Sequence, residues 1–266
     1  MVKDITLGQY FPGESIIHKA DPRVKIILTF AYMVVIFIVD TYFGFLMLSL
    51  FTLMTLVISN IPLKYTIRGL KPILFIVIFA TVINVFFVNE GKVLFEYGVI
   101  HITSMGVERA IKMTLRLILL IVTASMLTLT TTPIMLTDAI ESLMKPLSKL
   151  GVPAHEIAMM MTIALRFIPT LLEETDKIMK AQAARGADFD TGNLVQRAKS
   201  FIPVLVPLFI SAFRRADELA TAMEARCYRG SEGRTRMRQL KLGKADVIIT
   251  AFTLSLLGLV IYLQFV

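Results

Sequence analysis

Two arginines, Arg185 and Arg226, stand in the same local setting. Each follows an aspartate and two alanines at one spacing: Asp, four residues, Ala, two residues, then Ala-Arg. The two sets are Asp176, Ala181, Ala184 and Arg185, and Asp217, Ala222, Ala225 and Arg226. A guanidinium presents five N–H donors in a planar fork, which suits an acidic groove on another protein, and small neighbours leave it free to enter one. The repeat therefore indicates docking to two similar partners, or a dimer.

Helix capping is the alternative explanation for each arginine taken alone. An arginine near a helix C-terminus interacts favourably with the helix dipole by about 0.3–1 kcal/mol. Gly186 is a common type of residue just past a helix end. For Arg185 by itself, capping is the better explanation. The recurrence of the whole pattern shifts the balance towards partner docking.

Motifs of common catalytic and nucleotide-binding sites are absent from the sequence. It has no G-x-x-x-x-G-K-[ST] phosphate loop, no G-x-S-x-G and no H-E-x-x-H. The single cysteine, Cys227, excludes an internal disulfide, and His18, His101 and His155 are far apart, so we expect no metal site. We therefore predict that the chain is not an enzyme, binds no cofactor itself and cannot use ATP without a partner.

The composition is that of a membrane protein. The 266 residues are 56% hydrophobic, against about 45–50% in soluble domains, and the mean hydropathy is +0.72. Apolar residues gather in long runs, as membrane-crossing helices require. The net charge of +8 would suggest nucleic acid in a soluble protein, but lysine and arginine also collect on the cytoplasmic side of membrane proteins. We favour the membrane explanation and expect no nucleic-acid partner.

Five apolar runs predict five transmembrane helices, at residues 24–39, 42–58, 72–88, 105–130 and 245–266. Only Asp40 and Thr41 separate the first two runs, which predicts a tight helical hairpin. Its open ends carry lysine and arginine and its closed end carries neither, so the N-terminus is predicted to be cytoplasmic. These basic residues are Lys19, Arg23, Lys25, Lys64, Arg68 and Lys71. Glu108, Lys112 and Arg116 fall on the outer side in this topology, which counts against it. Residues 89–104 fit a short external β-hairpin.

The domain organisation follows from these runs. Residues 1–131 form an N-terminal membrane part with an amphipathic lead-in and four spans, residues 132–243 a cytoplasmic insert, and residues 244–266 the last span. The insert is charged and is expected to lack a run long enough to cross the membrane. It fits three helices: from Pro133 to about Gly151, from Pro153 to Arg185-Gly186, and from about Phe201 to Arg226 or Tyr228. The predicted fold class is an all-α integral membrane protein.

Apolar residues follow a helical spacing of 3.6 along the second and third insert helices. Several of them are methionines, including Met160 and Met161. Methionine fills protein cores, and it also forms adaptable surfaces that accept more than one partner. Core packing and an adaptable surface remain equally good explanations.

The sequence resembles the transmembrane T component (EcfT/CbiQ-like) of energy-coupling factor (ECF) ABC transporters, the vitamin and metal uptake systems of prokaryotes. The likeness covers nearly the whole chain and is most specific in the two Ala-Arg motifs. The segments that carry it include Phe11-Pro12-Gly13-Glu14-Ser15, Asp21-Pro22-Arg23, Thr131-Thr132-Pro133, Lys145-Pro146-Leu147, Phe167-Ile168-Pro169, Ala181-Gln182-Ala183-Ala184-Arg185-Gly186 and Ala222-Met223-Glu224-Ala225-Arg226-Cys227.

The resemblance implies a scaffold in the prokaryotic cell membrane that links two ATPase subunits to a substrate-binding S component. ATP-Mg would bind the partner ATPases, and the three insert helices would be coupling helices. The implied ATPase-docking residues are Ala184, Arg185, Gly186, Ala225, Arg226 and Cys227. The implied S-component interface comprises Leu143, Pro146, Leu147, Met160, Met161, Ala164, Ile168, Leu205 and Leu208. Cys227 departs from the glycine that is more usual in the family, which puts the second helix cap in question.

Two other functions remain open. A stand-alone permease or channel would need polar residues along a path through the membrane, and the spans show few. A membrane enzyme would need an acid, base or metal cluster. The resemblance places substrate specificity in the S component, which could be interchangeable, so it names no transported substrate.

Overall fold

The computed structural model describes residues 10–88, 90–97, 100–189, 191, 193–230 and 240–265. The chain divides into two compact units. Residues 8–139 and 238–266 form one, called the bundle unit here. The described residues from 140 to 230 form the other, called the arm unit. Helix α7 (Pro133–Met144) contains the division between them.

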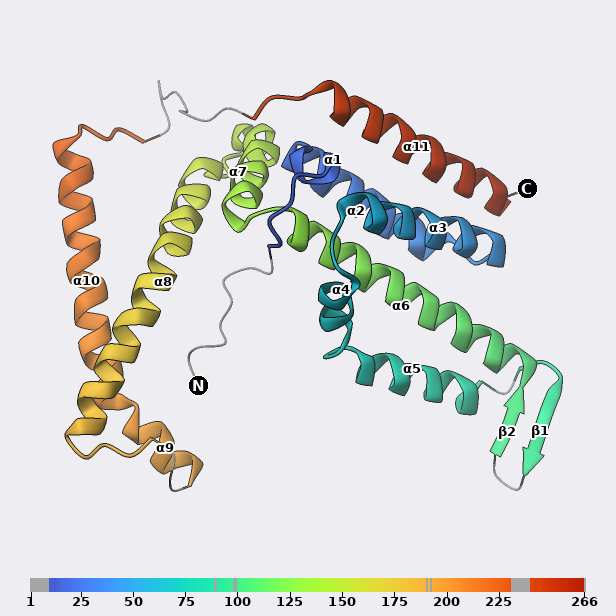
Figure 1. The fold of residues 1–266 in the computed structure, drawn as a ribbon, viewed down its shortest axis with the longest axis horizontal. Helices are drawn as coiled ribbons and strands as arrows, with labels where there is room; N and C mark the ends of the chain where they lie inside the picture. The colour runs from blue at the N-terminus through green and yellow to red at the C-terminus, as the bar shows by residue number, and fades with distance from the viewer. Residues whose placement is uncertain are drawn as a thin grey trace. The chain divides into compact units, whose positions relative to one another are not determined.

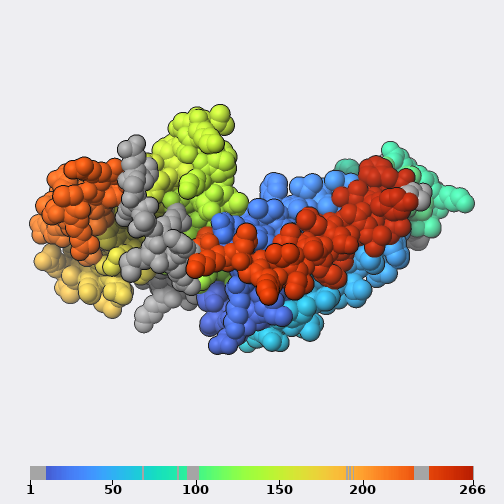
Figure 2. All heavy atoms as spheres, turned by 90° about the horizontal axis from the view of Figure 1, so that it is seen from above, coloured from blue at the N-terminus to red at the C-terminus, as the bar shows by residue number. Residues whose placement is uncertain are grey.

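The bundle unit is built around one long central helix, α6 (Ser104–Thr130), which packs against α2, α3, α4 and α5. The C-terminal helix α11 (Lys244–Phe265) packs against α2 and α3. Figure 1 shows α2, α3, α5, α6 and α11 running in roughly the same direction with the short α4 across them, and Figure 2 shows α11, in red, along one face of the unit. The other helices are α1 (Ile16–Lys19), α2 (Pro22–Ile38), α3 (Tyr42–Ser59), α4 (Leu63–Leu70) and α5 (Leu74–Phe87).

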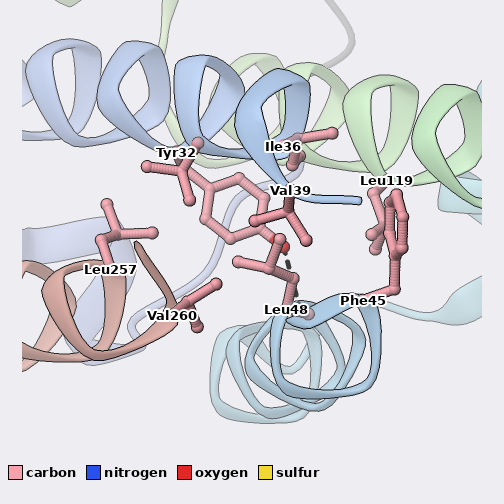
Figure 3. Close-up of a cluster of buried hydrophobic side chains, with 9 residues drawn as sticks. Tyr32, Ile36, Val39, Phe45, Leu48, Leu119, Leu257 and Val260 are labelled. Carbon is pink, nitrogen blue, oxygen red and sulfur yellow. Dashed lines mark hydrogen bonds between the residues drawn. The ribbon is translucent and has the colours of Figure 1, made fainter. Parts of the chain in front are cut away.

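A buried apolar cluster holds four of these helices together (Figure 3). Its members are Tyr32, Val35, Ile36 and Val39 of α2, Phe45 and Leu48 of α3, Leu119 of α6, and Leu257 and Val260 of α11. The Tyr32 hydroxyl lies 2.9 Å from the Leu48 carbonyl oxygen and 2.6 Å from the Thr52 hydroxyl. The ring is therefore buried without leaving its polar end unpaired.

At the closed end of the predicted hairpin, Arg116 of α6 caps the last turn of α2. Its guanidinium donates to the carbonyl oxygens of Ile36 (3.2 Å) and Val39 (2.9 Å) and pairs with Asp40 at 2.8 Å. The last carbonyls of a helix have no partner within the helix, so a cation is favourable there. Arg116, whose charge counted against a cytoplasmic N-terminus, thus stabilises the end of α2.

The arm unit contains α8 (Ala154–Ala184), α9 (Leu194–Ser200) and α10 (Ile202–Ala225). The three insert helices that the sequence predicts are found, with two differences. The first ends its α-helical part at Met144 and continues as a tighter 3₁₀ helix, η2 (Lys145–Leu150). The short helix α9 is not predicted. Its sequence signal was a capping box, in which Asn193 and Gln196 satisfy each other's backbone N–H groups.

Five helical segments are long and apolar enough to cross a membrane, as predicted, and the chain is an all-α membrane protein. They are Tyr42–Ser59, Ser104–Thr130, Ala154–Ala184, Val195–Ala225 and Lys244–Phe265. Three of these segments match predicted spans. The other two, Ala154–Ala184 and Val195–Ala225, lie in the predicted cytoplasmic insert. The expectation that the insert lacks a run long enough to cross a membrane is therefore wrong, as judged by the length and composition of these two segments.

Two of the predicted spans form helices that are shorter than the hydrocarbon core of a membrane is thick. Helix α2 has 17 residues and α5 has 14, or about 26 and 21 Å of helix against about 30 Å of hydrocarbon. Between α5 and α6 lies the predicted β-hairpin, in which β1 (Val93–Tyr97) pairs antiparallel with β2 (Ile100–Thr103).

Candidate partner-docking sites

Both Ala-Arg motifs end their helices in the same backbone geometry. Helix α8 ends at Ala184 with Arg185 as C-cap, and α10 ends at Ala225 with Arg226 as C-cap. After α8, the Gly186 N–H donates to the Ala183 carbonyl oxygen (3.0 Å) and the Ala187 N–H to that of Gln182 (3.0 Å). This pair of bonds is a Schellman motif, which satisfies carbonyls that the helix leaves unpaired.

The end of α10 repeats this pattern bond for bond. The Cys227 N–H donates to the Glu224 carbonyl oxygen (2.8 Å) and the Tyr228 N–H to that of Met223 (3.0 Å). Cys227 has φ +54°, in the left-handed region that the motif requires, and Gly186 has φ +91°. The substitution of cysteine for glycine therefore preserves the cap, at the cost of a conformation that side chains disfavour.

Each arginine is exposed at the end of its helix, as are Ala184, Gly186, Ala225 and Cys227. The cap fixes the backbone on both sides of each arginine, so the two side chains start from the same backbone geometry. The repeated pattern in the sequence thus corresponds to two similar, solvent-facing arginine sites.

The two arginine sites lie at opposite ends of a helix pair. Helices α8 and α10 run antiparallel. Gln182 near the end of α8 donates to the carbonyl oxygen of Pro203 near the start of α10 (3.3 Å), and Glu174, earlier in α8, contacts Arg215, later in α10. From Pro203 to Arg226 the helix rise amounts to about 35 Å. Figure 1 shows α8 and α10 close together near α9 and diverging from there. One groove of ordinary size could not receive both arginines.

A polar contact joins the two helices where they cross. Glu174 of α8 accepts hydrogen bonds from the Ser211 hydroxyl and, at 2.7 Å, from the Arg215 guanidinium of α10. Both charged side chains are partly shielded from water, so the pair contributes more than a fully exposed one would.

A second polar contact lies near the Arg226 end. His155, at the start of α8, is 3.0 Å from a Glu141 carboxylate oxygen and its other ring nitrogen is 3.4 Å from the Tyr228 hydroxyl. Tyr228 belongs to the cap of α10. The beginning of α8 and the end of α10 are therefore linked through side chains, although the helices diverge.

The residues of the predicted S-component interface lie along η2, α8 and α10 and at the end of α7. None is buried. Met160 is 59% exposed, Leu205 45% and Leu147 44%, and Pro146, Met161 and Ala164 are also exposed, whereas Leu143, Ile168 and Leu208 are half-buried. Of the two explanations for the methionines, the exposure of Met160 and Met161 favours an adaptable surface over a core.

Helix α10 carries further exposed apolar residues that the sequence interpretation missed. They are Ile202, Val206, Phe209, Ile210 and Phe213. Ile202, Val206, Phe209 and Phe213 recur at intervals of three and four, which is the signal of one helix face. The apolar surface of the arm unit is thus wider than predicted. In the part of the chain that the structure describes, no group of three or more metal-ligating side chains comes together.

Comparison with known proteins gives consistent matches. A family model for the cobalt transport protein CbiQ matches residues 13–237. The chain is similar to the energy-coupling factor transporter transmembrane protein EcfT of Ruminiclostridium cellulolyticum, with 65% identity over 266 residues, covering 100% of this chain and 99% of the relative. It is 56% identical over 257 residues to the protein of the same name from Clostridium kluyveri, covering 96% and 95%. The Bacillus subtilis protein of that name is 44% identical over 264 residues, covering 99% and 100%.

Proposed function

Because the chain belongs to the CbiQ/EcfT family of energy-coupling factor transporter membrane proteins, we propose that it is a non-catalytic coupling subunit. In this role it links ATP hydrolysis by two ATPase subunits to movement of a substrate-binding S component, for uptake of a vitamin or another micronutrient. The chain itself binds no cofactor, and ATP-Mg binds the ATPases. It lies in the cytoplasmic membrane of a prokaryote with its N-terminus inside.

The observation that carries this proposal is the matched pair of helix ends. Arg185 and Arg226 are both exposed and both held by a Schellman cap. They are separated by about 35 Å of helix. Two similar sites that far apart suit two related partner subunits, each receiving one arginine in an acidic groove.

The exposed apolar surface of the arm unit supports a second kind of partner. An apolar surface of this extent is costly in water and marks a protein or membrane interaction site. We assign the part that includes Leu147, Met160, Met161 and Leu205 to the S component. The adaptable methionines would allow one chain to serve more than one S component.

Coupling then requires that the two arginine ends move together with the apolar surface. The contact of Glu174 with Ser211 and Arg215 fixes the point where α8 and α10 cross. When ATP binding changes the distance between the two ATPases, the helix ends follow them. The crossing converts that change into a new angle of the apolar surface, which tilts or releases the S component.

Co-purification of the ATPases with arginine variants tests this proposal. Arg185→Ala and Arg226→Ala are each expected to weaken ATPase binding, and the double variant to abolish both binding and uptake. A buried charge-assisted contact at an interface costs about 2–5 kcal/mol when one partner is truncated, so the double variant should lose binding by several orders of magnitude.

Arg214→Ala is the matched control, because Arg214 is an exposed arginine in the middle of α10. It is expected to leave assembly unchanged. Normal assembly and uptake in the Arg185→Ala, Arg226→Ala double variant would refute the proposed docking sites.

A further inference from the structure

The segment Asp21-Pro22-Arg23-Val24-Lys25 at the start of α2 carries three charged residues that the proposed function leaves unused. Asp21 is the N-cap of α2 and is buried. The side chains of Arg23 and Lys25 both turn to backbone carbonyls elsewhere in the bundle unit rather than to water. Burying charged groups is costly unless they are paired, so these contacts require an explanation.

Lys25 binds the end of α6. Its ammonium donates to the carbonyl oxygens of Thr130 (3.1 Å) and His18 (3.1 Å) and to the Thr131 hydroxyl (3.2 Å). Thr130 and Thr131 are both buried. The last carbonyls of α6 lack partners within the helix and attract a cation. Lys25 therefore fixes the C-terminus of α6 with two hydrogen bonds and holds α1 with a third.

Asp21 and Arg23 bind the start of α11. The Asp21 N–H donates to one carboxylate oxygen of the buried Asp246 (2.7 Å), and the other oxygen accepts from the Gly243 N–H (2.7 Å). Arg23 pairs with Asp21 at 2.8 Å and donates to the Leu240 carbonyl oxygen (3.3 Å). Burial favours a raised pKa for the Asp21 carboxyl, but the bonds from Arg23 hold its pKa below the usual value.

These two anchored places lie within the bundle unit, each close in sequence to a point where the chain passes into or out of the arm unit. Thr131 directly precedes α7, within which the bundle unit gives way to the arm unit. After the arm unit, the described chain resumes in the bundle unit at Leu240, and Gly243 follows closely. Residues 21–25, at the start of α2, thus contact both bundle-unit segments that continue into the arm unit.

We propose that Asp21, Arg23 and Lys25 form a clamp that fixes, within the bundle unit, the two segments from which the chain continues into the arm unit, so that ATP-driven motion of the arm helices reaches the S component. The residues are positioning residues, since they contact neither ATPase nor substrate. This inference rests on the proposed function. An arm can tilt a partner only if its own base is fixed. If these segments are not fixed, ATP is still hydrolysed, but the motion displaces the segments and does not move the S component.

The test measures the complete complex in lipid vesicles, with the ratio of substrate imported to ATP hydrolysed as the readout. Lys25→Met keeps the length of the side chain and removes the charge and its three hydrogen bonds. It is expected to lower the ratio about tenfold, from the loss of hydrogen bonds to a charged group, with ATPase binding retained. Lys25→Arg, which can still donate to carbonyls, is expected to restore most of the ratio.

Lys19→Met is the matched control. Lys19 lies on neighbouring α1, its side chain is 68% exposed, and it pairs with the exposed Glu14 at 3.7 Å. It should keep the normal ratio. Thr131→Val is the milder variant, because it removes one acceptor of Lys25 while preserving size, and it should lower the ratio about twofold.

Three results would overturn the clamp. One is a normal ratio in Lys25→Met. Another is equal loss in Lys19→Met. The third is loss of ATPase binding in both Lys25→Met and Thr131→Val, which would mean that the contacts serve folding alone.

Failure of the proposed function is distinguishable, because the wild-type chain would then bind no ATPase. Amide hydrogen exchange of the full chain tests the clamp even then. Lys25→Met is expected to speed exchange just after Thr131, and Asp246→Ala around Gly243. Unchanged exchange at these two places would contradict the clamp.

Discussion

The two units use the same kinds of residues in opposite ways. In the bundle unit, apolar side chains are turned inward, and both buried clusters of the described residues lie there. In the arm unit, the described buried apolar residues are Ala154, Ala158 and Val204. In the most apolar stretch of α3, 33% is buried within the protein. In the corresponding stretches of α8 and of Val195–Ala225, the buried share is only 6% each. Hydropathy alone therefore does not separate a self-packed helix from one that awaits a partner.

Charged residues differ between the units in the same sense. In the bundle unit, Arg116 and Lys25 are directed to helix ends within the unit. In the arm unit, Arg185 and Arg226 are exposed at helix ends. These two cations of the bundle unit are paired within it, whereas the two arginines of the arm unit face outward. We infer that stability resides mainly in the first and recognition in the second.

The largest contrast is expected between two matched phenylalanines. Phe45→Ala removes a ring that is 2% exposed in the bundle core, and should cost about 3–5 kcal/mol of unfolding free energy. Phe209→Ala removes one that is 61% exposed on α10, and should change stability by less than about 0.5 kcal/mol. Denaturant unfolding of the purified chain in detergent measures both. Equal losses would erase the distinction between the units.

A smaller contrast is expected between two arginines. Arg116→Gln removes the charged donor to the Ile36 and Val39 carbonyls and should cost about 2 kcal/mol. Arg214→Gln, at an exposed position of α10, should be close to neutral. The same unfolding measurement applies, and a loss for Arg214 as large as that for Arg116 would contradict this comparison.

The two caps of the arm unit should respond in opposite directions. Gly186→Ala places a Cβ at φ +91°, where it meets no neighbouring atom, so the cost of about 1 kcal/mol is one of backbone conformation. Cys227→Gly relieves the conformation at φ +54° and should stabilise the end of α10 by up to about 1 kcal/mol. Amide exchange in the last turns of α8 and α10 would reveal both effects. Faster exchange in Cys227→Gly would show that cysteine is preferred there.

A substitution at Met160 should have the smallest effect on stability but a large effect on binding of the S component. Met160→Ser, at a side chain that is 59% exposed, should leave unfolding within about 0.5 kcal/mol of wild type. It should nevertheless weaken S-component binding, measured by co-purification. Unchanged binding in Met160→Ser combined with Leu205→Ser would remove this surface from the interface.

Local features of the fold could be predicted from the sequence because they depend on neighbouring residues. The helix ends at Arg185 and Arg226, the β-hairpin and the break at Gly151 follow from capping and turn residues close by. Contacts between distant segments could not be predicted. Asp21 and Asp246 are 225 positions apart, and nothing in either local sequence indicates the other.

The residues of the candidate sites could be predicted from the sequence, but their arrangement in space could not. Spacing identified the two Ala-Arg motifs, and helix periodicity identified much of the apolar surface. That the motifs lie at opposite ends of an antiparallel pair depends on how α9 turns the chain between α8 and α10. Periodicity also does not tell whether an apolar helix face is covered by its own chain. Residues 132–243 were expected to contain no segment long enough to span because they are charged, yet two of their helical segments are long and apolar enough.

Native mass spectrometry of the complex extracted from its own membranes tests the central claim most directly. The proposed function predicts one copy of this chain with two ATP-binding subunits and one further small membrane protein. Recovery of the chain alone or only with copies of itself, together with unaided transport by the purified chain in vesicles, would contradict it.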